Sequence, residues 1–210
     1  MPIIYLATSN PGKVREFREA AQALTLALDP LPGLSNIRPP VEDGTTFEQN
    51  ARIKAEYYST FVPGKLVLAE DSGLSVDALN GAPGVYSARY AAMLNSGSTS
   101  HENSDDQANN LALITQLERL LSSDLAGKYL SVIALARDKK TLVTVTGEAH
   151  GKLLTTPRGT GGFGYDPLFY FPLLNKTFAE LTLDQKREHS HRGQAFRRFL
   201  DWYSQHRNTL

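Results

Sequence analysis

The chain of 210 residues contains no cysteine, and this absence excludes several kinds of chemistry at once. It excludes disulfide bonds, thiolate nucleophiles and cysteine-based zinc or iron–sulfur sites. The chain also lacks an apolar run of 18 residues and a recognisable signal peptide, so we expect a cytoplasmic protein without membrane spans. Its 22 basic and 22 acidic side chains balance, which argues against binding along a nucleic-acid backbone.

The charges are balanced overall but unevenly placed along the chain. Between Lys186 and Arg207 there are six Lys or Arg and three His, against only two acids. The acids gather earlier, at Glu42, Asp43, Glu48, Glu70, Asp71 and Asp77. If folding brings these regions together, the resulting acidic and basic poles would suit a substrate that carries metal-bound phosphate.

The hydrophobic pattern predicts an α/β fold with a mixed sheet. Apolar runs indicate buried strands at residues 3–7 and 66–70. Helical spacing of apolar residues predicts helices at 46–61, 105–121 and 192–203. An antiparallel hairpin is predicted from the strand patterns at 129–137 and 141–149. Thr46 and Gln49 fit a capping box at the start of the second segment. Asp71, Ser72 and Gly73 are expected to form the turn that follows the strand at 66–70.

The segment LATSNPGKVREF, residues 6–17, places a lysine near the start of a predicted helix. Asn10 is the expected N-cap and Pro11 suits the first helical position, so Lys13 falls in the first turn. The helix dipole disfavours a cation there, unless the same helix end also holds an anion such as phosphate. The alternative is a solvated surface lysine.

The segment LAEDSG, residues 68–73, places two adjacent acids at the end of a buried strand. Open α/β sheets hold ligand groups at the carboxyl ends of their strands. Because Mg²⁺ prefers one or two carboxylates together with phosphate oxygens, we interpret these acids as ligands of Mg²⁺ or as activators of water. The alternative is an ion pair that caps a turn.

Two further segments combine residues suited to a nucleotide. In TGGFGYDP, residues 160–167, glycines allow close approach to a ligand, and Phe163 and Tyr165 offer ring faces to a planar base; a hairpin turn with core aromatics is the alternative. In HSHRG, residues 189–193, Arg192 offers five donors at a helix start. There the alternatives are a capped helix with exposed basic residues, and a zinc site made by these histidines with His150.

The order of these segments resembles the inosine triphosphate pyrophosphatase family, the non-canonical purine nucleoside triphosphate (dITP/XTP) pyrophosphatases. The resemblance runs from about Ile3 to Leu200 and rests on ATSNPGK, TFEQNA-x-x-KA, LAEDSGL-x-VDAL-x-GAPGVYSARYA, GTGGFGYDP-x-F, KTFAEL and K-x-x-x-SHRG. It implies one elongated, two-lobed α/β domain over residues 1–210, with a central mixed sheet flanked by helices, an active-site cleft between the lobes, and usually a homodimer.

The same resemblance implies Mg²⁺-dependent hydrolysis of ITP, dITP and XTP to the nucleoside monophosphate and pyrophosphate. It makes Asp71 the catalytic acid that orients or deprotonates water, and Lys13 its partner in catalysis. The residues carried over as substrate-binding are Thr8, Ser9, Asn10, Pro11, Gly12 and Lys13 for the triphosphate, Ser72, then Phe163, Gly164, Tyr165 and Asp166 for the nucleoside, and Lys186, His191 and Arg192 for base and phosphate. Asp71 and Glu42 would hold the metal.

This sequence departs from the family pattern at two positions. Gln49 stands where the family usually has Glu in T-F-x-E-N, so Glu42 or Glu48 must support the metal, and the spacing to the Gly44 turn favours Glu42. His189 stands where an aliphatic residue is usual. The rival hypotheses are a nucleotide-binding module with weakened turnover, for which Gln49 argues, a pyrophosphatase for other nucleotides, and a histidine-based metallophosphatase.

Overall fold

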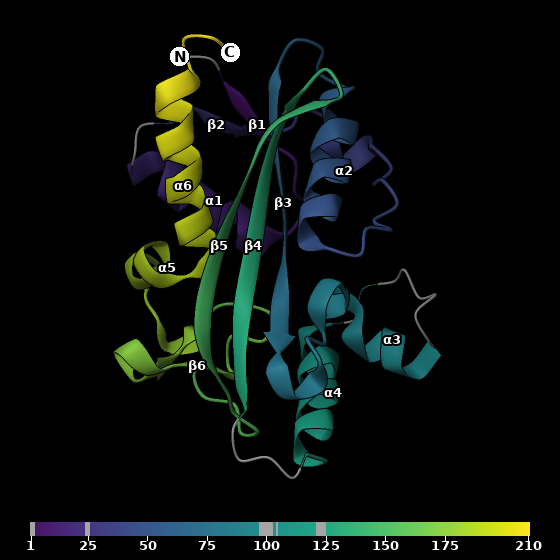
Figure 1. The fold of residues 1–210 in the computed structure, drawn as a ribbon, viewed down its shortest axis with the longest axis vertical. Coiled ribbons are helices and arrows are strands. Elements are labelled where there is room, and N and C mark those ends of the chain that lie inside the picture. Colours follow the sequence, from purple (N-terminus) through teal and green to yellow (C-terminus); the bar gives the residue numbers. More distant parts are fainter. Residues whose placement is uncertain (1–2, 24–25, 97–102, 104, 121–124) are drawn as a thin grey trace. The chain divides into compact units, whose positions relative to one another are not determined.

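A computed structural model of the chain describes residues 3–23, 26–96, 103, 105–120 and 125–210. Its strands are hydrogen-bonded in the order β2-β1-β3-β4-β5-β6-β7, a mixed seven-stranded sheet with helices, which confirms the predicted α/β class (Figure 1). The chain divides into two compact units: unit 1 is Met1–Asp71, Ser131–Glu148 and Arg187–Leu210, and unit 2 is Ser72–Leu130 and Ala149–Lys186. Over the described ranges, no helix is both long and apolar enough to cross a membrane.

Unit 1 consists of helices on both faces of a sheet. It contains β1 (Ile4–Leu6), α1 (Pro11–Ala23), β2 (Leu28–Pro30), α2 (Phe47–Ser59) and α6 (His191–His206), with parts of β3 (Leu66–Val76), β4 (Ala126–Arg137) and β5 (Lys140–Leu153). Strand β1 pairs in parallel with both β2 and β3. Helices α1 and α6 cover one face of these strands and α2 covers the other (Figure 1).

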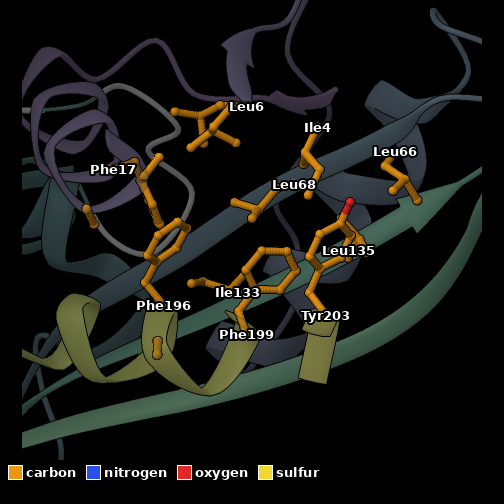
Figure 2. Packing of buried hydrophobic residues seen from close by; sticks show 14 residues of the cluster. Ile4, Leu6, Phe17, Leu66, Leu68, Ile133, Leu135, Phe196, Phe199 and Tyr203 are labelled. Carbon is orange, nitrogen blue, oxygen red and sulfur yellow. The ribbon is translucent and has the colours of Figure 1, made fainter. Parts of the chain in front are cut away.

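Side chains of the central strands in unit 1 alternate between these two faces. Leu66 and Leu68 of β3 pack with Ile133 and Leu135 of β4 beneath α1 and α6 (Figure 2). Val67 and Ala69 of β3 pack on the opposite face, with Val132, Ala134 and Ala136 of β4 and with Ala51 and Ala55 of α2. Since successive residues of a strand point to opposite faces, the next two residues of β3 also separate. Glu70 faces α1 and α6, whereas Asp71 faces α2.

Unit 2 is built around an aromatic core. It contains α3 (Tyr90–Ser96), α4 (Asp106–Glu118), β6 (Phe169–Phe171), β7 (Lys176–Thr177) and most of α5 (Leu183–His189), with the remaining parts of β3, β4 and β5. Strand β6 pairs antiparallel with β5 and with β7. The ring of Phe169 lies 4.8 Å from that of Tyr129 and 4.7 Å from that of Phe178, measured between centroids. These edge-to-face contacts fix the strand that follows the glycine-rich loop.

Most predicted elements are confirmed, with small shifts at their ends. Helix α1 begins at Pro11, and Thr46 caps α2 by accepting the N–H of Gln49 at 3.2 Å. The hairpin turns at Asp138 and Lys139, both of which have positive φ, as a type I′ turn requires. Helix α2 ends at Ser59 instead of residue 61, and α4 runs over Asp106–Glu118. The predicted end of that helix, at residue 121, lies outside the described residues.

The turn predicted at residues 71–73 is wrong, because β3 continues to Val76. Leu74 and Val76 are fully buried in the core of unit 2, and the N–H of Leu74 donates to Ser87 Oγ at 3.0 Å. Burial of these two apolar side chains favours continuing the strand over turning. Gly73 serves close packing instead, because a Cβ at this position would lie 2.8 Å from both Ser87 Cβ and the Gly84 carbonyl oxygen.

Candidate functional site

The loop from Thr8 to Asn10 and the first turn of α1 present polar groups at a helix N-terminus. Asn10 is the N-cap, as predicted: its Oδ1 accepts the N–H of Lys13 at 3.1 Å. Thr8 Oγ1 accepts the N–H of Asn10 at 3.3 Å, and Ser9, Asn10 and Pro11 are exposed. The free N–H groups of a helix start and a nearby lysine together favour an anion.

Glu70 lies at the centre of a buried ion-pair network in unit 1. Its side chain is fully buried, and Lys13 Nζ lies 2.7 Å from Oε2. The other oxygen, Oε1, accepts Ser131 Oγ–H at 2.7 Å and Arg192 Nε–H at 3.2 Å. Arg192 also pairs with Glu16 on α1. The acid therefore connects the first turns of α1 and α6, and so two residues predicted to bind substrate.

The charges around Glu70 keep it ionised in spite of its burial. Burial alone would raise the pKa of this carboxyl group, but the positive charges of Arg192 and Lys13 outweigh it, and the pKa lies well below its usual range. Glu70 is thus an anion at neutral pH. In the structure it is the partner of Lys13.

Asp71 belongs to a second network on the α2 side of the sheet. Lys54, from α2, lies with its Nζ 2.7 Å from Asp71 Oδ1 and 2.8 Å from Glu42 Oε2. The side chains of Lys54 and Asp71 are each 12% exposed, and that of Glu42 is 31% exposed. Two carboxylates from distant parts of the sequence thus share one cation.

Burial acts in opposite directions on the pKa values of Asp71 and Lys54. Burial raises the pKa of Asp71, and the negative charge of Glu42 adds to this, while Lys54 and Lys13 oppose it; the net shift is upward. Burial alone would lower the pKa of Lys54, but Asp71 and Glu42 outweigh it and raise the pKa above its usual range. Lys54 therefore stays protonated beside Asp71.

The shared position between Glu42 and Asp71 fits the donor set that Mg²⁺ requires. Mg²⁺ is usually held by one or two carboxylates, with substrate phosphate oxygens and water completing its shell. The two carboxylates already converge on one cationic group, Lys54 Nζ. No cluster of three or more His, Asp or Glu suited to a metal exists in the part of the chain that the structure describes, so the histidine-based metal site has no support there.

Gln49, the departure from the family pattern, supports the loop before α2. Its Oε1 accepts the backbone N–H of Thr45 at 2.7 Å and the Thr45 hydroxyl at 3.0 Å. The predicted capping box is thus only half confirmed, because the side chain reaches Thr45 instead of Thr46. Gln49 also lines a surface hollow of about 640 Å³, together with Asp43, Gly44, Thr46, Glu48, Arg52, Ile53 and Glu56.

In unit 2 the structure brings together most of the predicted base-binding residues. Lys186 and Asp166 form a buried ion pair, and Asp166 Oδ2 accepts the N–H of Phe163 at 3.0 Å. Lys186 Nζ lies 5.6 Å from the centroid of the Phe163 ring, which is partly exposed. The Lys186 ammonium therefore lies over the Phe163 ring, and the two groups are of the kinds that can recognise a planar, hydrogen-bonding base.

Tyr165 occupies a different environment from Phe163. It is 3% exposed, packs in the core of unit 2, and donates its hydroxyl hydrogen to the Ser87 carbonyl oxygen at 2.8 Å. Burial raises the pKa of this phenol. Of the two aromatic residues expected to offer a stacking face, only Phe163 is accessible. The predicted contact of Tyr165 with the nucleoside stays a prediction.

Gly164, between these two aromatics, is held from α4. Its N–H donates to Asp106 Oδ2 at 2.6 Å, and its carbonyl oxygen accepts Asn110 Nδ2–H at 3.0 Å. The residue has a φ of 62°, which glycine adopts without strain. The two side chains, one helical turn apart, therefore fix the conformation of the loop that carries Phe163.

The remaining predicted residues belong to different units. Ser72 is partly buried in β3 and belongs to unit 2. His191 is buried in the first turn of α6, where Ser190 is the N-cap and accepts the N–H of Gly193 at 3.0 Å. His189 is partly exposed, with Nε2 3.7 Å from a carboxylate oxygen of Glu188.

Sequence reasoning missed several residues that the structure adds to these networks. Lys54 was overlooked, although TFEQNA-x-x-KA contains it and it shares a helix face with Ala51 and Ala55. Glu16 follows Lys13 by three residues, the spacing that places two side chains on one helix face. Ser131, Asp106 and Asn110 carry no comparable signal, because their partners come from distant segments.

Comparison with known proteins places these features in a family. The model of the Ham1 family matches residues 4–202. A dITP/XTP pyrophosphatase of Acidobacterium capsulatum is 50% identical over 94% of this chain and 96% of its own length, and one of Thermus thermophilus is 42% identical over 95% and 91%.

Solved structures agree with the sequence relatives. A HAM1 protein from Coxiella burnetii superposes with a TM-score of 0.81 at 36% identity, covering 98% of this chain and all of that one. The Ham1 protein of Staphylococcus aureus gives a TM-score of 0.78 at 35% identity, with 96% and 97% covered. Since both sequence and fold match over nearly the whole length, this chain belongs to the Ham1 family.

Proposed function

We propose that the chain hydrolyses non-canonical purine nucleoside triphosphates, namely ITP, dITP and XTP, to the nucleoside monophosphate and pyrophosphate. The observation that carries this proposal is the convergence of Glu42 and Asp71 on one cation position, in the same unit as Lys13 at the start of α1. Relatives over nearly the full length are named dITP/XTP pyrophosphatases, which supports the same reaction.

Glu42 and Asp71 would hold a Mg²⁺ ion. When bound, this ion supplies neutralisation of charge on the triphosphate, which is the main requirement of phosphoryl transfer. Lys13 adds a positive charge at the helix start, where Thr8 to Gly12 offer backbone and side-chain donors to the phosphates. Glu70 keeps the Lys13 ammonium in place before the substrate arrives.

Asp71 would orient the attacking water and accept its proton. Its carboxylate, at the end of the unit 1 part of β3 and beside Glu42 at the proposed metal site, is placed to accept a hydrogen bond from that water. In the protein without metal, Lys54 donates to the same carboxylate and holds the side chain in one orientation. The chain needs no covalent nucleophile for this reaction.

Base selection would come from hydrogen bonding to side chains of the predicted base-binding set. Hypoxanthine and xanthine carry an oxygen at position 6, which can accept a hydrogen bond from Lys186 or Arg192. Adenine presents an amine there, so the protein donors would stay unpaired, and such sites discriminate by roughly 10⁴–10⁵. Guanine shares the 6-oxygen, so its exclusion must depend on the 2-amino group. Phe163, Gly164, Tyr165, Asp166, Ser72 and His191 complete the proposed substrate-binding set.

We further propose that residues 1–210 act as one pyrophosphatase domain; the proposed phosphate and metal groups belong to unit 1, and most of the proposed base groups belong to unit 2. The resemblance to the family also leads us to propose a homodimer, which light scattering would test. The substrates belong to the nucleotide pool, and on this basis we place the enzyme in the cytoplasm.

The test is pyrophosphate release from ITP, XTP, GTP and ATP, with Mg²⁺ and with EDTA. We expect fast Mg²⁺-dependent release from ITP and XTP, slow release from GTP and ATP, and loss of turnover in Asp71→Asn. Asp29→Asn, an exposed aspartate of unit 1, is the matched control and should behave as wild type. Intact ITP binding without turnover in the wild type would contradict the proposal and leave a binding module. Recovery by zinc but not magnesium after EDTA would point to histidine-based chemistry.

A further inference from the structure

Lys54 occupies the position between the two carboxylates to which the proposed function assigns the metal. Its Nζ lies 2.7 Å from Asp71 Oδ1 and 2.8 Å from Glu42 Oε2, both of which are hydrogen-bond distances. Such charge-assisted contacts are about twice as strong as neutral hydrogen bonds. In the structure, therefore, these two oxygens are already bound to a cation that belongs to the protein.

The position of Lys54 is fixed by the helix that carries it. Ala51 and Ala55, on the same face of α2, are completely buried against the sheet. The Lys54 side chain is itself only 12% exposed. The lysine is therefore a constrained part of unit 1, unlike a solvated side chain that moves freely among partners.

Charge balance makes the ammonium and a divalent cation compete. Two carboxylates with one lysine carry a net charge of −1, and a metal that contacted the same oxygens would add two positive charges beside the lysine. Like charges at contact distance repel strongly in a partly buried site. To contact Glu42 Oε2 and Asp71 Oδ1, Mg²⁺ would have to displace Lys54 from these two oxygens.

We propose that Lys54 is a built-in counter-ion that keeps Mg²⁺ from binding Glu42 and Asp71 until a nucleoside triphosphate is present. A triphosphate brings the metal and also offers Lys54 other anionic oxygens, so displacement of the lysine becomes favourable. Metal and nucleotide binding are then positively coupled, and the coupling is reciprocal. This inference rests on the metal site of the proposed function, but it concerns the protein without nucleotide.

The test measures Mg²⁺ binding in the absence of any nucleotide, by calorimetric titration of the wild type and of Lys54→Met. We expect the variant to bind Mg²⁺ at least about tenfold more tightly, which corresponds to about 1.4 kcal/mol. Its thermal midpoint should also rise with added Mg²⁺, while that of the wild type changes little. Adding Asp71→Asn to the variant should abolish the gain, because one of the two ligands is lost.

Two controls separate this role from a general effect of charge. Lys65→Met removes an exposed lysine of the same unit and should leave Mg²⁺ binding as in the wild type. Lys54→Arg retains the positive charge and should keep Mg²⁺ binding weak. Lys54→Gln provides a second neutral variant in case the methionine variant does not fold.

The inference is overturned if the neutral variants bind Mg²⁺ no more tightly than the wild type. Because no turnover is measured, these outcomes are independent of the pyrophosphate-release assay. A failed release assay with the Mg²⁺ difference intact would reject the proposed function and retain the counter-ion. The reverse pattern would retain the reaction and reject the counter-ion.

Discussion

Glu70→Gln should strongly destabilise unit 1, although it changes the shape of the side chain very little. The carboxylate is fully buried between Lys13, Arg192 and Ser131. Removing one partner from a buried ion pair typically costs about 3–5 kcal/mol, because the remaining charge is left without compensation. Here Glu16 still balances Arg192, and a glutamine oxygen can still accept from Ser131. We therefore expect the lower end, about 3 kcal/mol.

The destabilisation should depend on pH in a direction that the structure fixes. Against the raising effect of burial, Arg192 and Lys13 lower the pKa of Glu70 below that of an unfolded glutamate, about 4.3. A lowered pKa means that the stabilisation is fully present above the unfolded pKa and is lost as the pH falls toward the folded one. The difference between wild type and Glu70→Gln should thus be constant near neutrality and shrink below about pH 4.

Denaturant and thermal unfolding of both proteins, followed by circular dichroism at several pH values, provide the assay. For a chain of this size, about 3 kcal/mol corresponds to a decrease in the thermal midpoint of about 6–12 °C. Glu19→Gln, an exposed acid on α1, is the matched control and should change stability by less than about 0.5 kcal/mol. A Glu70→Gln protein within about 1 kcal/mol of the wild type at neutral pH, or a difference that persists unchanged in acid, would refute the reasoning.

Three smaller predictions concern individual hydrogen bonds. Tyr165→Phe removes the donor to the Ser87 carbonyl and should cost about 1 kcal/mol in unfolding free energy; no loss in denaturant unfolding would contradict the assigned bond. Thr46→Ala removes the N-cap of α2 and should also cost about 1 kcal/mol, whereas Thr46→Ser should restore most of it. Gln49→Glu should leave kcat/KM for XTP nearly unchanged, because the glutamine already binds Thr45; a tenfold gain, about 1.4 kcal/mol, would show that Gln49 weakens the enzyme.

Features that depend only on neighbouring residues could be predicted from the sequence. The cap at Asn10, the proline at the first position of α1 and the two-residue hairpin turn depend on neighbouring residues alone, and all three are present. The strand from Leu66 was recognised but ended too early. Its continuation depends on burial of Leu74 and Val76 in the core of unit 2, which no local pattern reports.

The candidate site was less accessible to sequence reasoning, because its ion pairs join distant segments. Glu70 and Asp71 were seen as one acidic pair, yet strand alternation directs them into separate networks on opposite faces of the sheet. Lys54 comes to Asp71 across 17 residues of sequence. Arg192 comes to Glu70 across 122 residues. Such partners are determined only by the fold.

The measurement that tests the central claim most directly is product analysis of XTP and ATP turnover by the wild-type protein with Mg²⁺. We predict that XTP is converted to equal amounts of the monophosphate and pyrophosphate, while ATP is left largely intact. Formation of the nucleoside diphosphate and inorganic phosphate, or equal turnover of ATP and XTP, would contradict the account.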